Sequence, residues 1–153
     1  MKTMFKLALA MAGAVLLLAG CAGPRYADVS SQIPDIEPGL GRIYVYQLAN
    51  AKDVAQPAIM VNGRKVGRSK AGRFFFVDRP AGVTTLTLAP DRKNPDAGIK
   101  FELSAGQTRY VRVDVEGGKQ VLRQEASADV ATQSLADLKY WGAGHRDREK
   151  LRY

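Results

Sequence analysis

The stretch GRIYVYQL, residues 41–48, decides the fold of this chain. Its β-branched and aromatic residues fit the pleated surface of a strand. Because side chains alternate between the two faces of a strand, Ile43 and Val45 would point to one face. Tyr44 and Tyr46 would point to the other, so both faces are apolar. The stretch therefore predicts a central strand, with the tyrosine hydroxyls reaching toward the edge of the core.

Short strand-like stretches separated by turn residues follow this one along the chain. They lie at 57–69 around Asn62-Gly63, and at 73–78, 83–89, 99–104, 108–116 and 119–125, the last two joined by Gly117-Gly118. Asn-Gly and Gly-Gly pairs accept the positive φ angles that tight hairpins need. No segment of helical periodicity interrupts the series, which disfavours a βαβ fold. We predict a mainly β fold, an antiparallel β-sandwich of about seven strands over residues 41–125, with a small barrel as the alternative.

One C-terminal α-helix is predicted after the strands, over residues 128–141. Ser127 precedes it as an N-cap. Ala131, Leu135 and Leu138 form one apolar stripe along it. The glycines that follow would end the helix and leave a charged tail.

The first 21 residues have the features of an export signal. Lys2 and Lys6 precede the apolar run 7–20, whose 14 residues are too few to span a bilayer core that needs about 20. The run ends in Leu18-Ala19-Gly20-Cys21, which resembles the lipobox of bacterial lipoproteins. This resemblance implies cleavage between Gly20 and Cys21 and acylation of Cys21 with chains such as palmitate. The alternative is an ordinary signal peptide, or a short membrane anchor, with an incidental cysteine.

The expected organisation has four regions. Residues 1–20 form a lipoprotein signal peptide, 21–40 the lipidated cysteine and a flexible tether, 41–125 the β-sandwich, and 126–153 the C-terminal helix and basic tail. Cys21 is the only cysteine of the chain, so no internal disulfide can form.

The net charge and the export signal limit the classes of partner that this protein could bind. The formal charge is +8, or +6 once Lys2 and Lys6 leave with the signal peptide. A basic exported protein could meet anionic lipid head groups or cell-wall polymers, whereas export takes it away from nucleic acid. A solvated surface rich in lysine and arginine is the alternative. In Gram-negative lipoproteins an Asp after the cysteine favours retention in the inner membrane, so Ala22 favours the outer membrane, facing the periplasm, over the inner membrane.

Three stretches carry a resemblance to a known class of domains. They are GRIYVYQ at 41–47, IMVNGRKVGRSKAGRFFFVDRPAG at 59–82 and SAGQTRYVRVDV at 104–115. They resemble a family of bacterial lipoprotein domains classed as of unknown function, and their turns are similar to those of PEGA-type β-sandwich modules. The chain departs from the family pattern where Ala81 stands between Pro80 and Gly82. The resemblance implies a fold and a lipoprotein class, and it supplies no activity.

No constellation of catalytic residues emerges from the sequence. His145 is the only histidine and no Gly-x-Ser-x-Gly stretch surrounds a serine. Cys21 and His145 cannot supply the three or four ligands of a zinc site, so no metal or cofactor is expected. Carboxylates that could pair as in a glycosidase are expected beside turns and on solvent faces, where they aid solubility. They are Asp78, Asp91, Asp96, Glu102 and Asp114.

Two side-chain groups carry binding hypotheses. The first, here called the basic run, consists of Arg64, Lys65, Arg68, Lys70 and Arg73. It predicts a positive edge that could contact anionic head groups, lipopolysaccharide phosphates or peptidoglycan carboxylates; the alternative is protection of a sheet edge from strand addition. The second group is aromatic and consists of Tyr44, Tyr46, Phe74, Phe75, Phe76 and Tyr110. Aromatic residues in strands predict core, with an exposed carbohydrate platform as the alternative.

These observations favour a non-enzymatic envelope lipoprotein, held at a membrane by lipid on Cys21 and acting as a structural or interaction module. The first alternative is a binding module for a cell-wall glycan, an anionic lipid or a partner protein that docks on an exposed sheet edge. An envelope hydrolase is the less favoured alternative.

Overall fold

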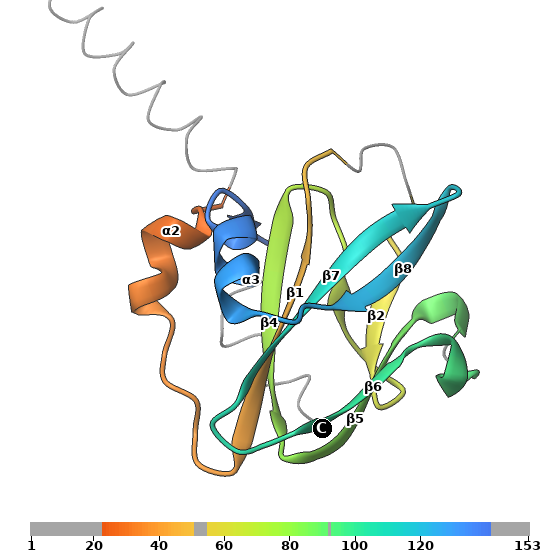
Figure 1. Cartoon of the computed structure of the whole chain (residues 1–153), viewed down its shortest axis with the longest axis horizontal. Coiled ribbons are helices and arrows are strands. Elements are labelled where there is room, and N and C mark those ends of the chain that lie inside the picture. Colours follow the sequence, from red (N-terminus) through yellow and green to blue (C-terminus); the bar gives the residue numbers. More distant parts are fainter. Residues whose placement is uncertain (1–22, 51–54, 92, 142–153) are drawn as a thin grey trace, which may run out of the picture.

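The computed structural model describes residues 23–50, 55–91 and 93–141 (Figure 1). Within these ranges the chain forms nine strands and five short helices. The strands are β1 Leu40–Gln47, β2 Ala58–Val61, β3 Arg64–Arg68, β4 Arg73–Pro80, β5 Gly82–Leu88, β6 Ile99–Leu103, β7 Thr108–Glu116, β8 Lys119–Gln124 and β9 Lys139–Tyr140. The α-helices are α2 Tyr26–Val29 and α3 Ala128–Leu135, and the 3-10 helices are η2 Ser30–Gln32, η3 Ala89–Asp91 and η4 Pro95–Ala97.

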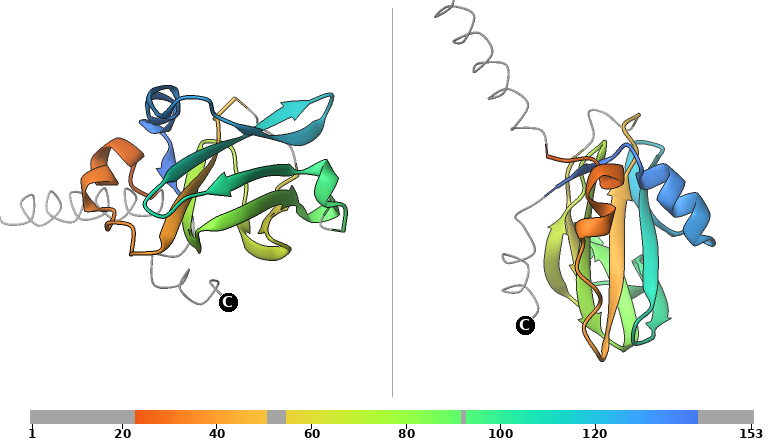
Figure 2. Two further views of the ribbon diagram at one scale, coloured as in Figure 1. Left: turned by 60° about the horizontal axis from the view of Figure 1, so that its bottom comes forward. Right: turned by 90° about the vertical axis from the view of Figure 1, so that its left-hand side faces the viewer.

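The strands form two sheets that pack face to face (Figure 2). The five-stranded sheet has the order β8-β7-β1-β4-β9, and the four-stranded sheet has the order β3-β2-β5-β6. The chain passes from the first sheet to the second at Ala81, between β4 and β5. The right-hand view of Figure 2 shows β2 and β3 on one side of the sandwich and α3 on the other. The predicted β-sandwich is confirmed, and β1 is its central strand.

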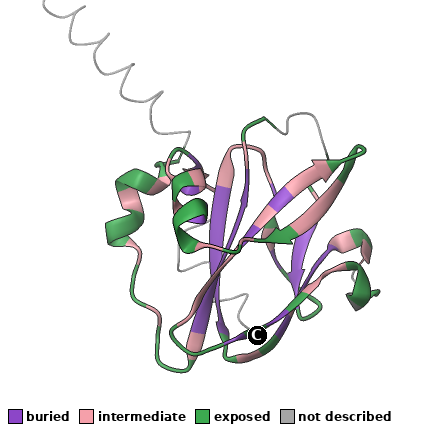
Figure 3. Cartoon of the chain, viewed as in Figure 1, coloured by how far each residue is buried: buried purple, intermediate pink, exposed green. Residues whose placement is uncertain are grey.

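An apolar core fills the space between the two sheets. It consists of Ile43, Val45, Ile59, Val61, Val66, Phe75, Val77, Leu86, Leu88, Phe101, Leu103, Val111 and Val113. Ile43 and Val45 enter it from β1, as the alternation of the opening stretch predicts. Figure 3 shows β1 and β4 buried along most of their length. Full burial of one such side chain stabilises a fold by about 1.5–3 kcal/mol, so this core is the main source of stability.

A second apolar cluster covers the outer face of the five-stranded sheet. The buried members are Tyr44, Tyr46, Phe74, Phe76, Leu135 and Leu138. The aromatic residues come from β1 and β4, and the two leucines come from α3 and the turn that follows it. Both faces of β1 and β4 are therefore packed with apolar side chains, which explains why β1 is apolar on both sides.

Part of the expected flexible tether is folded against this cluster. Tyr26 and Val29 pack on it from α2, and Ile33 packs on it from the position after η2. The backbone N–H of Tyr26 donates to the carbonyl oxygen of Leu138 at 2.9 Å. The segment is rich in proline and glycine, but its three apolar side chains find a hydrophobic surface. Burial of these side chains offsets the loss of chain entropy.

Two features differ from the sequence prediction. The helix α3 ends at Leu135 instead of residue 141, because a turn follows it and Lys139–Tyr140 join a sheet. The N–H of Lys139 donates to Gly72 and that of Trp141 to Phe74, so their backbone groups bind β4 and its preceding turn. The sandwich is also not wholly antiparallel, because β7 pairs with β1, and β9 with β4, in the parallel sense.

Both predicted hairpin turns are present. Asn62 and Gly63 have φ angles of 48° and 76°, and Gly117 and Gly118 have 55° and 76°. Two successive positive φ values are the geometry of the turn that matches the twist of a hairpin. The side chain of Asn62 also accepts a hydrogen bond from the N–H of Thr85 at 2.8 Å, which ties the turn to β5.

Candidate functional site

The basic run separates into two groups in the structure. Arg64, Lys65 and Arg68 lie along β3, an edge strand of the four-stranded sheet, and they are exposed. Arg68 donates from Nη1 to the carbonyl oxygen of Gln56 at 3.0 Å. A β-bulge also interrupts the pairing of β3 with β2. Exposed cations and bulges are features by which edge strands avoid pairing with another chain.

The other two members of the basic run lie beside Trp141. The Nζ atom of Lys70 is 4.2 Å from the centre of a Trp141 ring, and Cζ of Arg73 is 5.7 Å from it. Both distances are within the range of cation–π attraction. Arg73 also faces Lys139 across the pair β4–β9. We call Lys70, Arg73, Lys139 and Trp141 the basic corner.

A salt bridge on the outer face of the five-stranded sheet joins β1 to β4. Nε of Arg42 donates to Oδ1 of Asp78 at 2.7 Å, and Nη2 donates to Oδ2 at 2.8 Å. Nη1 donates to the carbonyl oxygen of Pro34 at 2.8 Å, and the guanidinium carbon lies 4.6 Å from the centre of the Phe76 ring. Burial alone would lower the pKa of Arg42, but its hydrogen bond and charge interaction with Asp78 outweigh burial and raise that pKa.

The expectation that Asp78 lies on a solvent face is wrong. Asp78 is 5% exposed, because β4 continues past it to Pro80 and the register places it directly opposite Arg42. The two hydrogen bonds make Arg42 and Asp78 a compensated buried pair, because removal of either partner would leave the other's charge without a counter-charge in an apolar environment.

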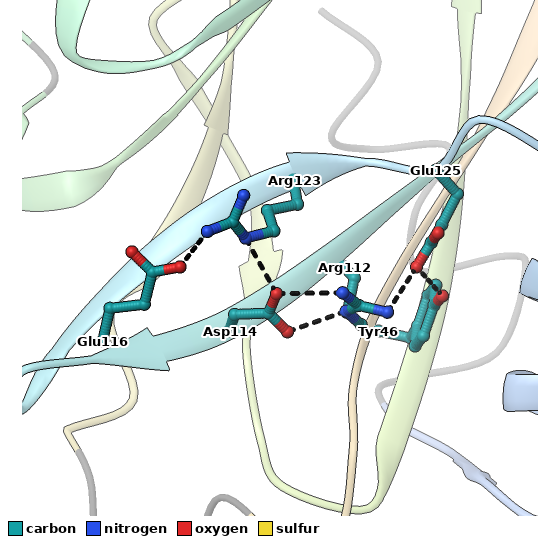
Figure 4. Close-up of polar contacts among 6 residues, drawn as sticks. All are labelled: Tyr46, Arg112, Asp114, Glu116, Arg123 and Glu125. Carbon is teal, nitrogen blue, oxygen red and sulfur yellow. Dashed lines mark hydrogen bonds and ion pairs between the residues drawn. The ribbon is translucent and has the colours of Figure 1, made fainter.

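A network of charged side chains runs along the hairpin of β7 and β8 (Figure 4). Arg112 lies at its centre, with Nε 2.7 Å from Oδ1 of Asp114 and Nη1 2.9 Å from Oε1 of Glu125. Nε of Arg123 lies 3.1 Å from Oδ2 of Asp114, and Arg123 also pairs with Glu116. The hydrogen bond to Asp114 raises the pKa of Arg112. Each carboxylate of the network therefore faces at least one guanidinium.

The network ends at the phenol of Tyr46. Its hydroxyl donates to Oε1 of Glu125 at 2.7 Å, so β1 is tied to the end of β8. Burial raises the pKa of Tyr46, and the hydrogen bond to the Glu125 carboxylate raises it further. The phenol remains a proton donor across the neutral range and holds Glu125 in place.

The six aromatic side chains that the sequence predicts to be core residues pack in the two apolar clusters, as predicted. Tyr44, Tyr46, Phe74 and Phe76 belong to the outer cluster, with Tyr110 packed against it. Phe75 lies between the sheets. These six side chains therefore provide no row of exposed rings for a sugar.

The described residues contain small hollows and no metal-ligand cluster. An apolar cavity of about 160 Å³ lies between η2 and the outer cluster, with Ile33, Phe74 and Phe76 among its walls. No group of three or more His, Cys, Asp or Glu residues in the described ranges could hold a metal ion. No helix within those ranges is long and apolar enough to cross a membrane. Gly20, Cys21 and His145 lie outside the described residues.

A protein-family model described as "Protein of unknown function (DUF2846)" matches residues 37–126. The matched range covers more than half of the chain and contains all strands from β1 to β8. The chain belongs to this family. No curated protein and no solved structure matches the chain. The predicted relation to a domain family of unknown function is confirmed, while the lipoprotein class and the PEGA likeness stay predictions.

The DUF2846 range separates the structural features into two sets. The Arg42–Asp78 pair and the Arg112 network lie within it, and so do Lys70 and Arg73. The elements α2, α3 and β9 lie outside it, and with them Lys139 and Trp141. The DUF2846 range thus holds the strands β1 to β8, while the flanking chain adds β9 at the edge of the five-stranded sheet, covers part of its outer face and completes the basic corner. Sequence reasoning missed Lys139 and Trp141 because both fell within the predicted helix.

Proposed function

We propose that this protein is an envelope lipoprotein that is anchored to a membrane by lipid on Cys21 and acts as a non-enzymatic structural or interaction module. The sequence Leu18-Ala19-Gly20-Cys21, at the end of a charge-free run of 14 residues, carries this proposal. Two or three acyl chains on one residue provide stable anchoring, whereas a single chain binds a membrane only marginally. The Ala at position 22 favours the outer membrane, on the periplasmic side.

The arrangement of the folded body supports this proposal. Every described element begins after residue 22, so cleavage before Cys21 would remove none of them. The carboxylate of Asp78 is paired with Arg42, and those of the Arg112 network are each paired with Arg112 or Arg123. Paired groups of this kind favour a structural role over acid–base chemistry, which needs a carboxyl group with a tuned pKa.

The anchor is tested by replacing Cys21 with Ser in cells that make the protein. We expect the wild-type protein to incorporate labelled palmitate and to have Cys21 as its first residue by mass spectrometry. Cys21→Ser should lose the label and keep residues 1–20. A wild-type protein without label, or one that begins elsewhere, would contradict the anchor.

A second substitution serves as the matched control and tests the location. Ala22→Asp leaves the cysteine and the apolar run unchanged, so palmitate labelling should persist. We expect this variant to move from the outer-membrane to the inner-membrane fraction in a density gradient. A wild-type protein already in the inner-membrane fraction would contradict the proposed location and leave the anchor standing.

Binding of an anionic cell-wall polymer through β3 is the second candidate function. The observation that favours it is the row of exposed cations Arg64, Lys65 and Arg68 along this edge. Sedimentation with isolated cell walls would test it, because the triple substitution of these residues by Gln should reduce co-sedimentation. Unchanged co-sedimentation would contradict the binding role.

A further inference from the structure

The first described residues lie against the basic corner. The N–H of Tyr140 donates to the carbonyl oxygen of Pro24 at 2.9 Å. A β-carbon on Gly23 would lie 2.6 Å from the carbonyl oxygen of Tyr140 and 3.5 Å from Nη1 of Arg73. The backbone at Gly23 is therefore in close contact with β9 and with a cation of the basic corner. Figure 1 shows the start of α2 and the end of the described chain meeting at the upper left.

The basic corner brings like charges together. Arg73 and Lys139 are direct partners in the register of β4 and β9, and like charges in that position repel. Within the described ranges, neither Lys70 nor Lys139 forms an ion pair. An anionic surface would relieve this repulsion.

The nearby carboxylates are engaged by another cation. Arg25, next to Pro24, pairs with Asp28 at 3.0 Å and lies 3.8 Å from Asp137. Both of these carboxylates are exposed. Their two negative charges offset the charge of Arg25 and the charge of one cation of the basic corner. Among the described residues, the region therefore retains a positive balance beside Trp141.

The proposed lipid attachment lies within a short reach of this corner. Two residues of extended chain span about 7 Å, and that is all that separates Cys21 from Gly23. We infer that the basic corner rests on the phospholipid surface around the anchor, with Lys70, Arg73 and Lys139 at the lipid phosphates and the Trp141 ring at the level of the head groups. The inference rests on the proposed anchoring through Cys21. The sequence alone predicts a folded body that a flexible tether holds away from the membrane. In the arrangement inferred here, the folded body instead lies directly on the membrane surface.

The chemistry of the four side chains fits a phospholipid surface. Trp combines an apolar ring with one N–H donor and concentrates at membrane–water interfaces. Lysine and arginine are attracted to anionic lipids over about one Debye length, so the contact should weaken at high salt. A cation stacked on an indole ring presents both features at the same place.

Trp141 is the only tryptophan of the chain and provides the probe. The acylated full-length mature protein is reconstituted into vesicles of phosphatidylethanolamine and phosphatidylglycerol that carry a spin label on the head group or deep in the acyl chain. We expect the head-group label to quench Trp141 strongly and the deep label to quench it weakly. Added salt, or vesicles of phosphatidylcholine alone, should reduce the quenching by the head-group label.

The substitutions Lys70→Gln, Arg73→Gln and Lys139→Gln together should reduce this quenching to the level seen with phosphatidylcholine. The matched control replaces Arg64, Lys65 and Arg68 with Gln, which removes the same number of charges from β3 and should leave the quenching unchanged. Lys70→Gln alone provides a milder test if the triple variant is poorly folded by circular dichroism, and it should produce a partial loss. Quenching is expressed as the ratio with and without label, so changes in intrinsic emission cancel.

The outcomes separate the contact from the anchor. A protein that floats with the vesicles but whose Trp141 is quenched by aqueous iodide and not by the head-group label overturns the contact and leaves the anchor standing. Equal loss of quenching in both triple variants also overturns it, because the effect would then be one of total charge. A protein without lipid on Cys21 by mass spectrometry overturns both the anchor and the contact.

Discussion

Arg42 and Asp78 face each other across β1 and β4 and are joined by two hydrogen bonds of 2.7 and 2.8 Å, with each residue only 5% exposed. Because Arg42 also donates to Pro34, the pair fixes the chain before β1 to the outer face of the sheet. In a buried pair of this kind each charge depends on the other, because removal of one partner leaves an uncompensated charge in an apolar site.

Asp78→Asn should lower the free energy of unfolding by about 3–5 kcal/mol, because the buried charge of Arg42 loses its counter-charge. Urea denaturation followed by the fluorescence of Trp141 measures the change. The double variant Arg42→Met with Asp78→Leu should be more stable than Asp78→Asn, since no buried charge remains. A loss below about 1 kcal/mol for Asp78→Asn would contradict the assignment of a tightly held pair.

The phenol of Tyr46 predicts a loss of stability at high pH. Its pKa is raised above the usual value of about 10, first by burial and then by its hydrogen bond to Glu125. The unfolded chain therefore loses this proton at a lower pH than the folded protein. The stabilising contribution is complete below pH 10 and is lost as the pH rises toward the raised value.

Tyr46→Phe isolates this effect, because Tyr44 and Tyr110 also have pKa values raised by burial and remain as a common background. The variant should lose about 1 kcal/mol at neutral pH through the missing hydrogen bond. Above pH 10 its stability should fall less steeply than that of the wild type, by up to about 1.4 kcal/mol per pH unit. Parallel pH profiles for the two proteins, obtained from urea midpoints, would show that the phenol does not titrate differently on folding.

The strands of the sandwich were predictable because their signals are local. Alternation of apolar residues marks β1, and the pairs Asn62-Gly63 and Gly117-Gly118 mark two hairpins whose φ angles only such residues adopt readily. In the sequence, only the tyrosines of β1 indicate that the outer face of the five-stranded sheet is covered. The elements that cover it are short, and their helical or extended state depends on what they pack against.

The remaining features depend on contacts between distant parts of the chain. Asp78 is buried because Arg42, 36 residues earlier, lies opposite it, and no local pattern gives that register. Leu138 continues the apolar stripe of α3, so the sequence favours a longer helix there, but pairing with β4 makes Lys139–Tyr140 a strand. The basic corner likewise joins residues 70 and 73 to residues 139 and 141 only in space.

The cations of β3 predict a change in self-association. Replacement of Arg64, Lys65 and Arg68 with Thr keeps β-propensity while removing the charges that keep another strand from pairing with this edge. We expect the variant to associate in a concentration-dependent way in analytical ultracentrifugation, with unchanged circular dichroism at low concentration. Replacement by Glu serves as the control, because charge of either sign blocks edge pairing. Association of both variants would indicate that the basic character, and not charge as such, keeps the chains apart.

Gly67 lies against the ring of Phe75, and this contact predicts that a larger side chain at position 67 will be destabilising. A β-carbon on Gly67 would lie 2.8 Å from Cζ of Phe75, which is 1% exposed and packed between the sheets. Gly67→Ala should therefore lower the free energy of unfolding by about 1–3 kcal/mol through overpacking. Phe75→Leu removes the atoms that clash, so Gly67→Ala should cost less in the Phe75→Leu background than in the wild type, a coupling that urea denaturation of the four proteins measures. Equal costs in the two backgrounds would show that the backbone at position 67, and not the ring of Phe75, causes the loss.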